Sequence, residues 1–117
     1  MPTITVYSHW ADRREYAEAT GVAGPTWTGD VPAGDLDAIY RLLNRVTAAD
    51  HRRLRELGYF LPSLSMGDVI VLDDDTPSPS HHLVGPFGFT PISGSDYEAI
   101  RSSADPFGAA EHLALCA

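Results

Sequence analysis

The 117-residue chain contains no lysine and one cysteine, and both shortages restrict what the protein can be. All eight basic residues are arginine, and 16 acidic residues give a formal net charge of −8. Cys116 has no partner for an internal disulfide, which is typical of proteins from a reducing, cytoplasmic compartment. No signal-peptide pattern follows Met1, and the apolar run from Val69 to Leu72 is far too short to cross a membrane. Secreted and membrane-spanning proteins are therefore not expected.

The length of the chain and its 44% apolar residues predict a single folded domain over residues 1–117. Its charge is unevenly distributed. Residues 1–37 carry six acids and two arginines, a balance of −4; residues 38–67 carry five arginines and two acids, a balance of +3. Residues 68–117 carry eight acids and one arginine, a balance of −7. Such a protein repels phosphate backbones over most of its surface but could present one basic face.

Short runs rich in β-branched and aromatic residues predict a small antiparallel sheet. The best defined of them follows the Gly67-Asp68 turn, because its four residues are apolar on both faces. The glycine- and proline-rich stretch 21–34 is expected to be a loop, with Trp27 folded onto the core. A strand-rich motif covers residues 61–92. The four predicted strands are residues 3–7, 69–72, 82–84 and 87–90.

A pair of helices over residues 35–58 is predicted to pack on this sheet, which makes the fold α+β. Thr47 with Asp50 resembles a capping box at the start of the second helix, and Gly58 is its expected stop. In the first helix, residues spaced three and four apart predict one buried face. That face comprises Leu36, Ile39, Tyr40, Leu43 and Val46.

Three shorter helices complete the prediction. One covers residues 10–20, and a terminal one covers residues 106–115. Between the last strand and the terminal helix, Ser95 and Glu98 form a second expected capping box for a short helix that ends near Ile100.

Arginines on the helical pair form one candidate binding site. On two consecutive helices they could make a single basic patch for a phosphate-bearing partner such as nucleic acid. The simpler interpretation is a solvated face whose arginines pair with the acid-rich remainder, because a net-acidic protein must place its few cations somewhere. The residues concerned are Arg41, Arg45, Arg52, Arg53 and Arg55.

Two other groups are predicted to bind a protein partner. The run Asp73, Asp74 and Asp75 could offer oxygens to Ca²⁺ or Mg²⁺, but it lacks the central glycine and alternating ligands of an EF-hand loop. It is therefore interpreted as a charged hairpin tip. Phe87 and Phe89 fall on the same face of a strand, where they cover a small sheet or, if exposed, mark a binding surface. Gly88 between them would allow another backbone to approach closely.

No pattern predicts a metal, a cofactor or a catalytic residue. His112 and Cys116 stand four residues apart, a spacing at which two ligands can share a metal, but a zinc site would need further ligands such as His81 or His82. No serine lies in a G-x-S-x-G elbow, and the Gly-Pro-Phe-Gly sequence at residues 85–88 lacks the lysine and glycine spacing of a phosphate loop. Enzymatic turnover is thus unsupported.

Two blocks of the strand-rich motif resemble a known family. Residues 63–72 read SLSMGDVIVL and residues 83–92 read LVGPFGFTPI, which is similar to the signature of the YodL-like group of small domains from bacterial plasmids, phages and integrative elements. The helical segment IYRLLN at residues 39–44 also looks similar to members of this group. The chain departs from the pattern at His81-His82, where a tyrosine-rich strand is usual, and after Ser93. The resemblance implies a role in antirestriction, plasmid maintenance or transfer, without catalytic residues to carry over.

The sequence therefore predicts a non-catalytic accessory protein of a mobile genetic element that acts by binding another protein. In a sharper version, acidic side chains imitate DNA phosphates and inhibit a host defence protein. The alternative is a nucleic-acid-binding accessory or regulatory protein that uses the arginines. The free strand edges of so small a sheet could also support a homodimer.

Overall fold

The computed structural model describes residues 3–9, 11, 25–32, 35–73, 78–85 and 88–116, which form an α+β fold as predicted. A five-stranded antiparallel sheet has the order β2-β1-β3-β4-β5. Its strands are β1 (Thr3–Tyr7), β2 (Thr26–Asp30), β3 (Val69–Asp73), β4 (Ser80–Gly85) and β5 (Gly88–Ile92). The described helices are α2 (Leu36–Leu43), α3 (Ala48–Leu57), α4 (Gly94–Ser102) and α5 (Pro106–Cys116). The helix predicted over residues 10–20 lies outside the described residues, except for Ala11.

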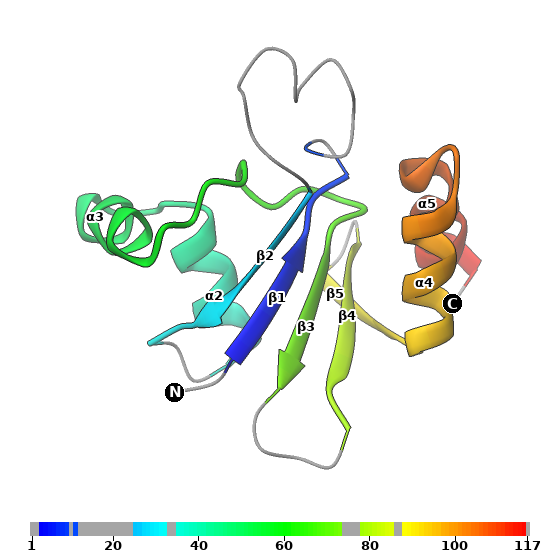
Figure 1. The fold of residues 1–117 in the computed structure, drawn as a ribbon. Coiled ribbons are helices and arrows are strands. Elements are labelled where there is room, and N and C mark those ends of the chain that lie inside the picture. The colour runs from blue at the N-terminus through cyan, green and yellow to red at the C-terminus, as the bar shows by residue number, and fades with distance from the viewer. Residues whose placement is uncertain are drawn as a thin grey trace.

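Two helical pairs cover opposite faces of the sheet (Figure 1). α2 and α3 pack on the face that carries Ile4, Val6 and Ile70, whereas α4 and α5 pack on the face that carries Val69 and Leu83. Side chains of β3 alternate between the two cores, because successive residues of a strand point to opposite faces. Each pair covers a different part of the sheet, so none of the described helices covers the remainder of either face.

The second strand is absent from the prediction, which placed a loop over residues 21–34. β2 pairs with β1 from Tyr7 opposite Thr26 to Thr3 opposite Asp30, and the Oγ1 atoms of Thr5 and Thr28 lie 2.8 Å apart across the two strands. Pairing with β1 thus fixes as a strand the run Thr26-Trp27-Thr28, which favours a strand but lies within a stretch whose glycines and prolines favour a loop. Trp27 is buried on the core as predicted.

The first helix of the predicted pair is shorter than expected. α2 ends at Leu43, and Asn44 accepts a hydrogen bond from the Leu64 backbone N–H through Oδ1 at 2.6 Å. Arg45 then adopts a left-handed conformation with φ 56°. The prediction placed Val46 on the buried face of this helix, but the early end leaves its side chain 65% exposed.

The predicted caps of α3 are confirmed, whereas the capping box of α4 lies at other residues than predicted. Thr47 and Asp50 form the capping box of α3, and Gly58 ends this helix in the left-handed conformation. The capping box of α4, however, is made by Ser93 and Asp96 rather than by Ser95 and Glu98. Because β5 extends through Ile92, the chain is still extended at Ser93, which is the geometry that an N-cap requires.

Candidate functional site

A hollow of about 320 Å³ lies between α2 and the β4–β5 hairpin, on the part of the sheet that α2 and α3 do not cover. The ring of Tyr40 on α2 meets the ring of Phe89 on β5 edge-on, with 5.9 Å between the centroids. Asp37, one helical turn before Tyr40, places a carboxylate at the rim of the hollow. The prediction put Tyr40 on the buried face of its helix, but 37% of its side chain is exposed here.

The strands that form the other wall of the hollow place His82 and Phe89 on the same face of the sheet. Their ring centroids lie 6.5 Å apart, in an edge-on arrangement. Gly88 adopts φ 119°, and among the described residues other than its chain neighbours no atom lies within 4 Å of the position that a Cβ would occupy. The glycine is therefore required by the backbone conformation of the turn and not, as predicted, by the close approach of another element.

Partial burial lowers the pKa of the His82 imidazole below its usual value of 6.5, and the neighbouring His81 lowers it further. His82 Nε2 lies 2.8 Å from Ser80 Oγ. His81 points to the opposite face, where its ring contacts Tyr97 at 5.4 Å. The His82 imidazole is thus expected to be uncharged at neutral pH.

An NMR-detected titration should find the midpoint of His82 below 6.5, and replacing His81 with alanine should move it upward without restoring 6.5, because burial is the larger cause. The folded protein binds this proton less tightly than the unfolded chain does, so acidification to about pH 6.5 and below should reduce stability. A midpoint at or above 6.5 would contradict the burial of the ring.

The five residues predicted to bind a partner do not form one surface as far as they are described. Asp73 is exposed at the end of β3 and belongs to the face that carries Thr3 and Asp30. Phe89 is half-buried on the opposite face and pairs with Val84 beside the β4–β5 turn. Asp74, Asp75 and Phe87 lie outside the described residues.

The five arginines also lie in different environments. Arg45 points inward, where its guanidinium donates to the backbone carbonyl of Leu61 at 2.9 Å and lies over the ring of Tyr59. Among the described residues, no carboxylate forms an ion pair with any of the other four. Arg41 and Arg53 line a second hollow, of about 450 Å³, between α2 and α3.

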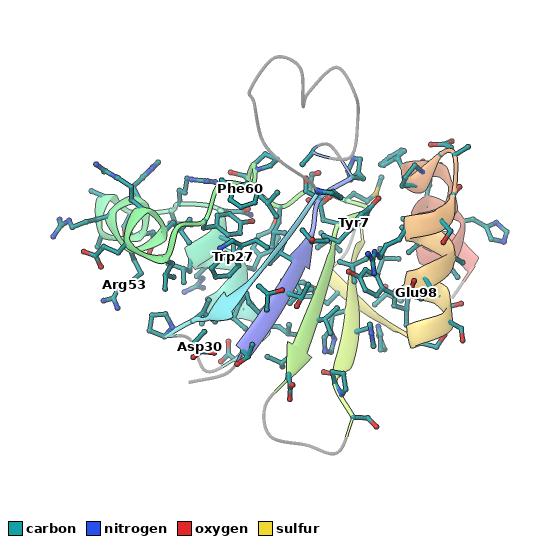
Figure 2. All side chains as sticks on the ribbon, in the orientation of Figure 1. Tyr7, Trp27, Asp30, Arg53, Phe60 and Glu98 are labelled. Carbon is teal, nitrogen blue, oxygen red and sulfur yellow. The ribbon has the colours of Figure 1, made fainter. Side chains whose placement is uncertain are left out.

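Arg52 and Arg55 lie on a different side of α3 from Arg53. Because consecutive residues of a helix are rotated by about 100°, Arg52 and Arg55 are about 60° apart, whereas each is 100° or more from Arg53. Figure 2 shows the Arg53 side chain below α3 in that view. The arginines therefore form no single continuous patch.

A buried polar cluster that the sequence analysis missed joins β1 to the start of β3. Asp68 is fully buried, and its carboxylate accepts hydrogen bonds from the backbone N–H groups of His9 at 3.0 Å and Ser65 at 2.9 Å. The same carboxylate lies 2.7 Å from His9 Nδ1. The ring of Phe107 on α5 also contacts the His9 ring, with 5.1 Å between the centroids. The Gly67-Asp68 turn was visible in the sequence, but nothing local indicates its partner 59 residues earlier.

This cluster holds the fold together and offers little access to a ligand. His9 is 4% exposed and Asp68 is 0% exposed. Gly67 has φ 98°, and a Cβ at this position would lie 3.1 Å from the Phe107 ring and 3.3 Å from His9 Nδ1. Only glycine suits this position, so His9, Gly67 and Asp68 are assigned a structural role.

No group of three or more His, Cys, Asp or Glu residues that could hold a metal ion is present in the described part of the chain. His112 is exposed on α5, while the side chain of Cys116 lies outside what the structure describes. None of the described helices is long and apolar enough to cross a membrane. Comparison of the chain with protein-family models, curated proteins and solved structures finds no match.

Proposed function

We propose that this protein is a non-catalytic accessory protein that acts by binding a protein partner at the hollow between α2 and the β4–β5 hairpin. The observation that carries the proposal is the aromatic pair Tyr40–Phe89, which faces solvent with the Asp37 carboxylate at its rim. Protein interfaces concentrate binding energy in aromatic anchors that lie in pockets with a polar rim. The hollow offers that combination.

The negative charge of this protein indicates what kind of surface a partner would present. With a net charge of −8 and Asp37 at the rim, the site favours a partner that inserts an apolar side chain flanked by arginine or lysine. Basic surfaces of this kind are typical of proteins that bind nucleic acids. This supports the sharper version of the proposal, in which the partner is a host defence protein and the setting is the bacterial cytoplasm. The mobile-element context rests on the resemblance at residues 63–72 and 83–92.

The double variant Tyr40→Ala/Asp37→Asn should lose the partner that the unaltered protein captures. The tagged protein is incubated with lysate of a related bacterium, with and without nuclease, and bound proteins are identified by mass spectrometry. Both altered side chains are exposed, so their replacement should change partner contacts and leave the fold intact. We expect one protein to survive nuclease treatment and to fall at least about tenfold in recovery with the variant.

The matched control is Phe60→Ala/Glu56→Gln, which also removes one exposed aromatic ring and one exposed carboxylate, outside the hollow. Recovery of the partner should be unchanged with this control. Equal capture by all three proteins would contradict the proposed site. Capture that disappears with nuclease would favour nucleic acid instead.

If acidic side chains imitate DNA phosphates, reversing Asp73, Asp74 and Asp75 to lysine should abolish inhibition of the captured defence protein. The reversal changes the net charge by +6, from −8 to −2, at the exposed end of β3 and the residues after it. Inhibition is measured as the residual activity of the purified partner on DNA. Glu111→Lys, on α5, is the control for charge elsewhere. Undiminished inhibition by the triple variant would refute this mode of action.

A nucleic-acid-binding accessory protein remains the second candidate. The observation that favours it is that Arg41, Arg52, Arg53 and Arg55 have no carboxylate partner among the described residues. Against it stand the overall charge of −8 and the use of Arg45 inside the fold. Binding of this kind weakens steeply as the salt concentration rises.

A further inference from the structure

We infer that the hollow between α2 and α3 is a second binding site, which takes an acidic peptide segment of a partner protein. The carboxylates of the peptide would pair with Arg41 and Arg53, and an aliphatic side chain between them would cover Val46. This inference goes beyond the proposed function, because it concerns a different hollow, lined by Ala38, Arg41 and Leu42 of α2, and a ligand of opposite charge.

The cationic part of the site comes from two helices. Arg41 belongs to the last turn of α2 and Arg53 to the middle of α3, and both exposed side chains line the hollow. No described carboxylate pairs with either of them, although acids outnumber arginines two to one in the chain. A guanidinium group binds a carboxylate through two parallel hydrogen bonds, so two free groups around one hollow suit a ligand with two or more carboxylates.

The first turn of α3 also borders the hollow, and it contributes both signs of charge. Thr47 and Asp50 lie there, and the helix N-terminus carries partial positive charge. The Asp50 carboxylate is occupied, because its Oδ2 accepts a hydrogen bond from the Thr47 backbone N–H at 3.0 Å in the capping box. One carboxylate therefore offsets part of the charge of the two guanidinium groups, and the hollow remains cationic.

The apolar part of the site favours a peptide over a nucleic acid as the ligand. Val46 is 65% exposed beside Leu42, because the chain leaves α2 at Asn44 and turns at Arg45. A phosphate backbone would pair with the arginines but would leave the Val46 side chain uncovered. A peptide with an aliphatic residue between acidic residues would satisfy both parts. A long polyanion would in addition meet the repulsion of a protein of charge −8.

The test uses the purified protein and a phage-displayed library of random 12-residue peptides. Three proteins are compared: the unaltered chain, Arg41→Ala/Arg53→Ala and the control Arg52→Ala/Arg55→Ala. Both variants remove two arginines, but only the first changes the hollow. We expect the unaltered protein and the control to enrich peptides in which Asp or Glu flanks Leu, Ile or Val. The variant without Arg41 and Arg53 should enrich none of them.

The most enriched peptide is then synthesised with a fluorophore and titrated by fluorescence polarisation. Its affinity should fall at least about tenfold for Arg41→Ala/Arg53→Ala, change less than about twofold for the control, and fall for Val46→Asn. The variant Tyr40→Ala/Asp37→Asn should still bind this peptide, which separates the inference from the proposed function. Circular dichroism and thermal unfolding establish that each variant is folded.

Three results would overturn the inference. The first is a selection that yields no acidic peptide. The second is an equal loss of affinity for the two double arginine variants, which would indicate only diffuse attraction. The third is tighter binding of a single-stranded 20-nucleotide DNA or RNA than of the peptide, with the loss confined to Arg41→Ala/Arg53→Ala, which would assign the hollow to nucleic acid.

Discussion

Replacing Asp68 with alanine is expected to destabilise the protein by about 3–5 kcal/mol, which is a large part of the stability of a domain of this size. The carboxylate is fully buried and accepts hydrogen bonds from the backbone N–H groups of His9 and Ser65. Without it, the buried N–H of His9 and the partly buried N–H of Ser65 both lose their acceptor, and a buried group without one costs about 1–3 kcal/mol. The measurement is the free energy of unfolding in urea, followed by tryptophan fluorescence.

Two further variants test the cause of this loss. Asp73→Ala removes an exposed carboxylate at the other end of β3 and should change stability by less than about 0.5 kcal/mol. Asp68→Asn keeps one oxygen for His9 but turns an amide group toward a second donor, so its effect should be intermediate. A loss below about 1 kcal/mol for Asp68→Ala would refute the role assigned to this residue.

Replacing Trp27 with alanine should cost about 3–5 kcal/mol, for a different reason. The indole is 8% exposed and packs edge-on against the ring of Tyr59, with 5.2 Å between the centroids. Figure 2 shows it between the sheet and the α2–α3 pair. Because the substitution leaves a cavity in that core, the loss should appear in urea unfolding followed by far-ultraviolet circular dichroism, which does not depend on the indole.

The exposed ring of Phe60 serves as the comparison. It lies in the segment that follows α3, with 42% of its side chain in solvent, so Phe60→Ala should cost much less than Trp27→Ala. Losses of equal size for the two variants would mean that Trp27 does not anchor the core.

The elements predicted correctly are those whose signals lie within a few residues. β1 follows from a run of β-branched residues, and β3 from four apolar residues after a turn. The capping box of Thr47 and Asp50 and the stop at Gly58 define α3 at both ends. Here local preference and the final fold agree, which makes local signals reliable.

The errors arise where contacts distant in the sequence determine the structure. β2 begins with the strand-favouring run Thr26-Trp27-Thr28, but the glycines and prolines around this run favour a loop, and pairing with β1 decides between the two. α2 ends early because Asn44 binds the backbone at Leu64, 20 residues later. Two Ser-x-x-acid patterns overlap before α4, and the end of β5 selects the first of them. Tertiary contacts override local preference in each case.

In the candidate sites, too, the sequence indicates the residue types, but contacts between distant segments determine how they are arranged. Arg41 and Arg53 are candidates by residue type, but only the structure shows that they line one hollow that Arg52 and Arg55 do not line. Tyr40 was assigned to the core by its helical spacing, although the half-covered sheet leaves it beside Phe89 in the other hollow. Burial depends on how far the covering helices extend, which periodicity does not report.

The two-sided apolar character of β3 has a consequence for the alignment of the whole sheet. A strand that buries one face resists slipping by one residue, because the slip would expose its apolar side chains. β3 gives no such resistance, since Val69, Ile70, Val71 and Leu72 would fill either core after a slip. The Asp68 carboxylate, fixed to His9 just beyond β1, permits a single alignment of the two strands. Several alignments of β1 and β3 would bury similar amounts of apolar surface, and the polar cluster thus specifies which of them the chain adopts.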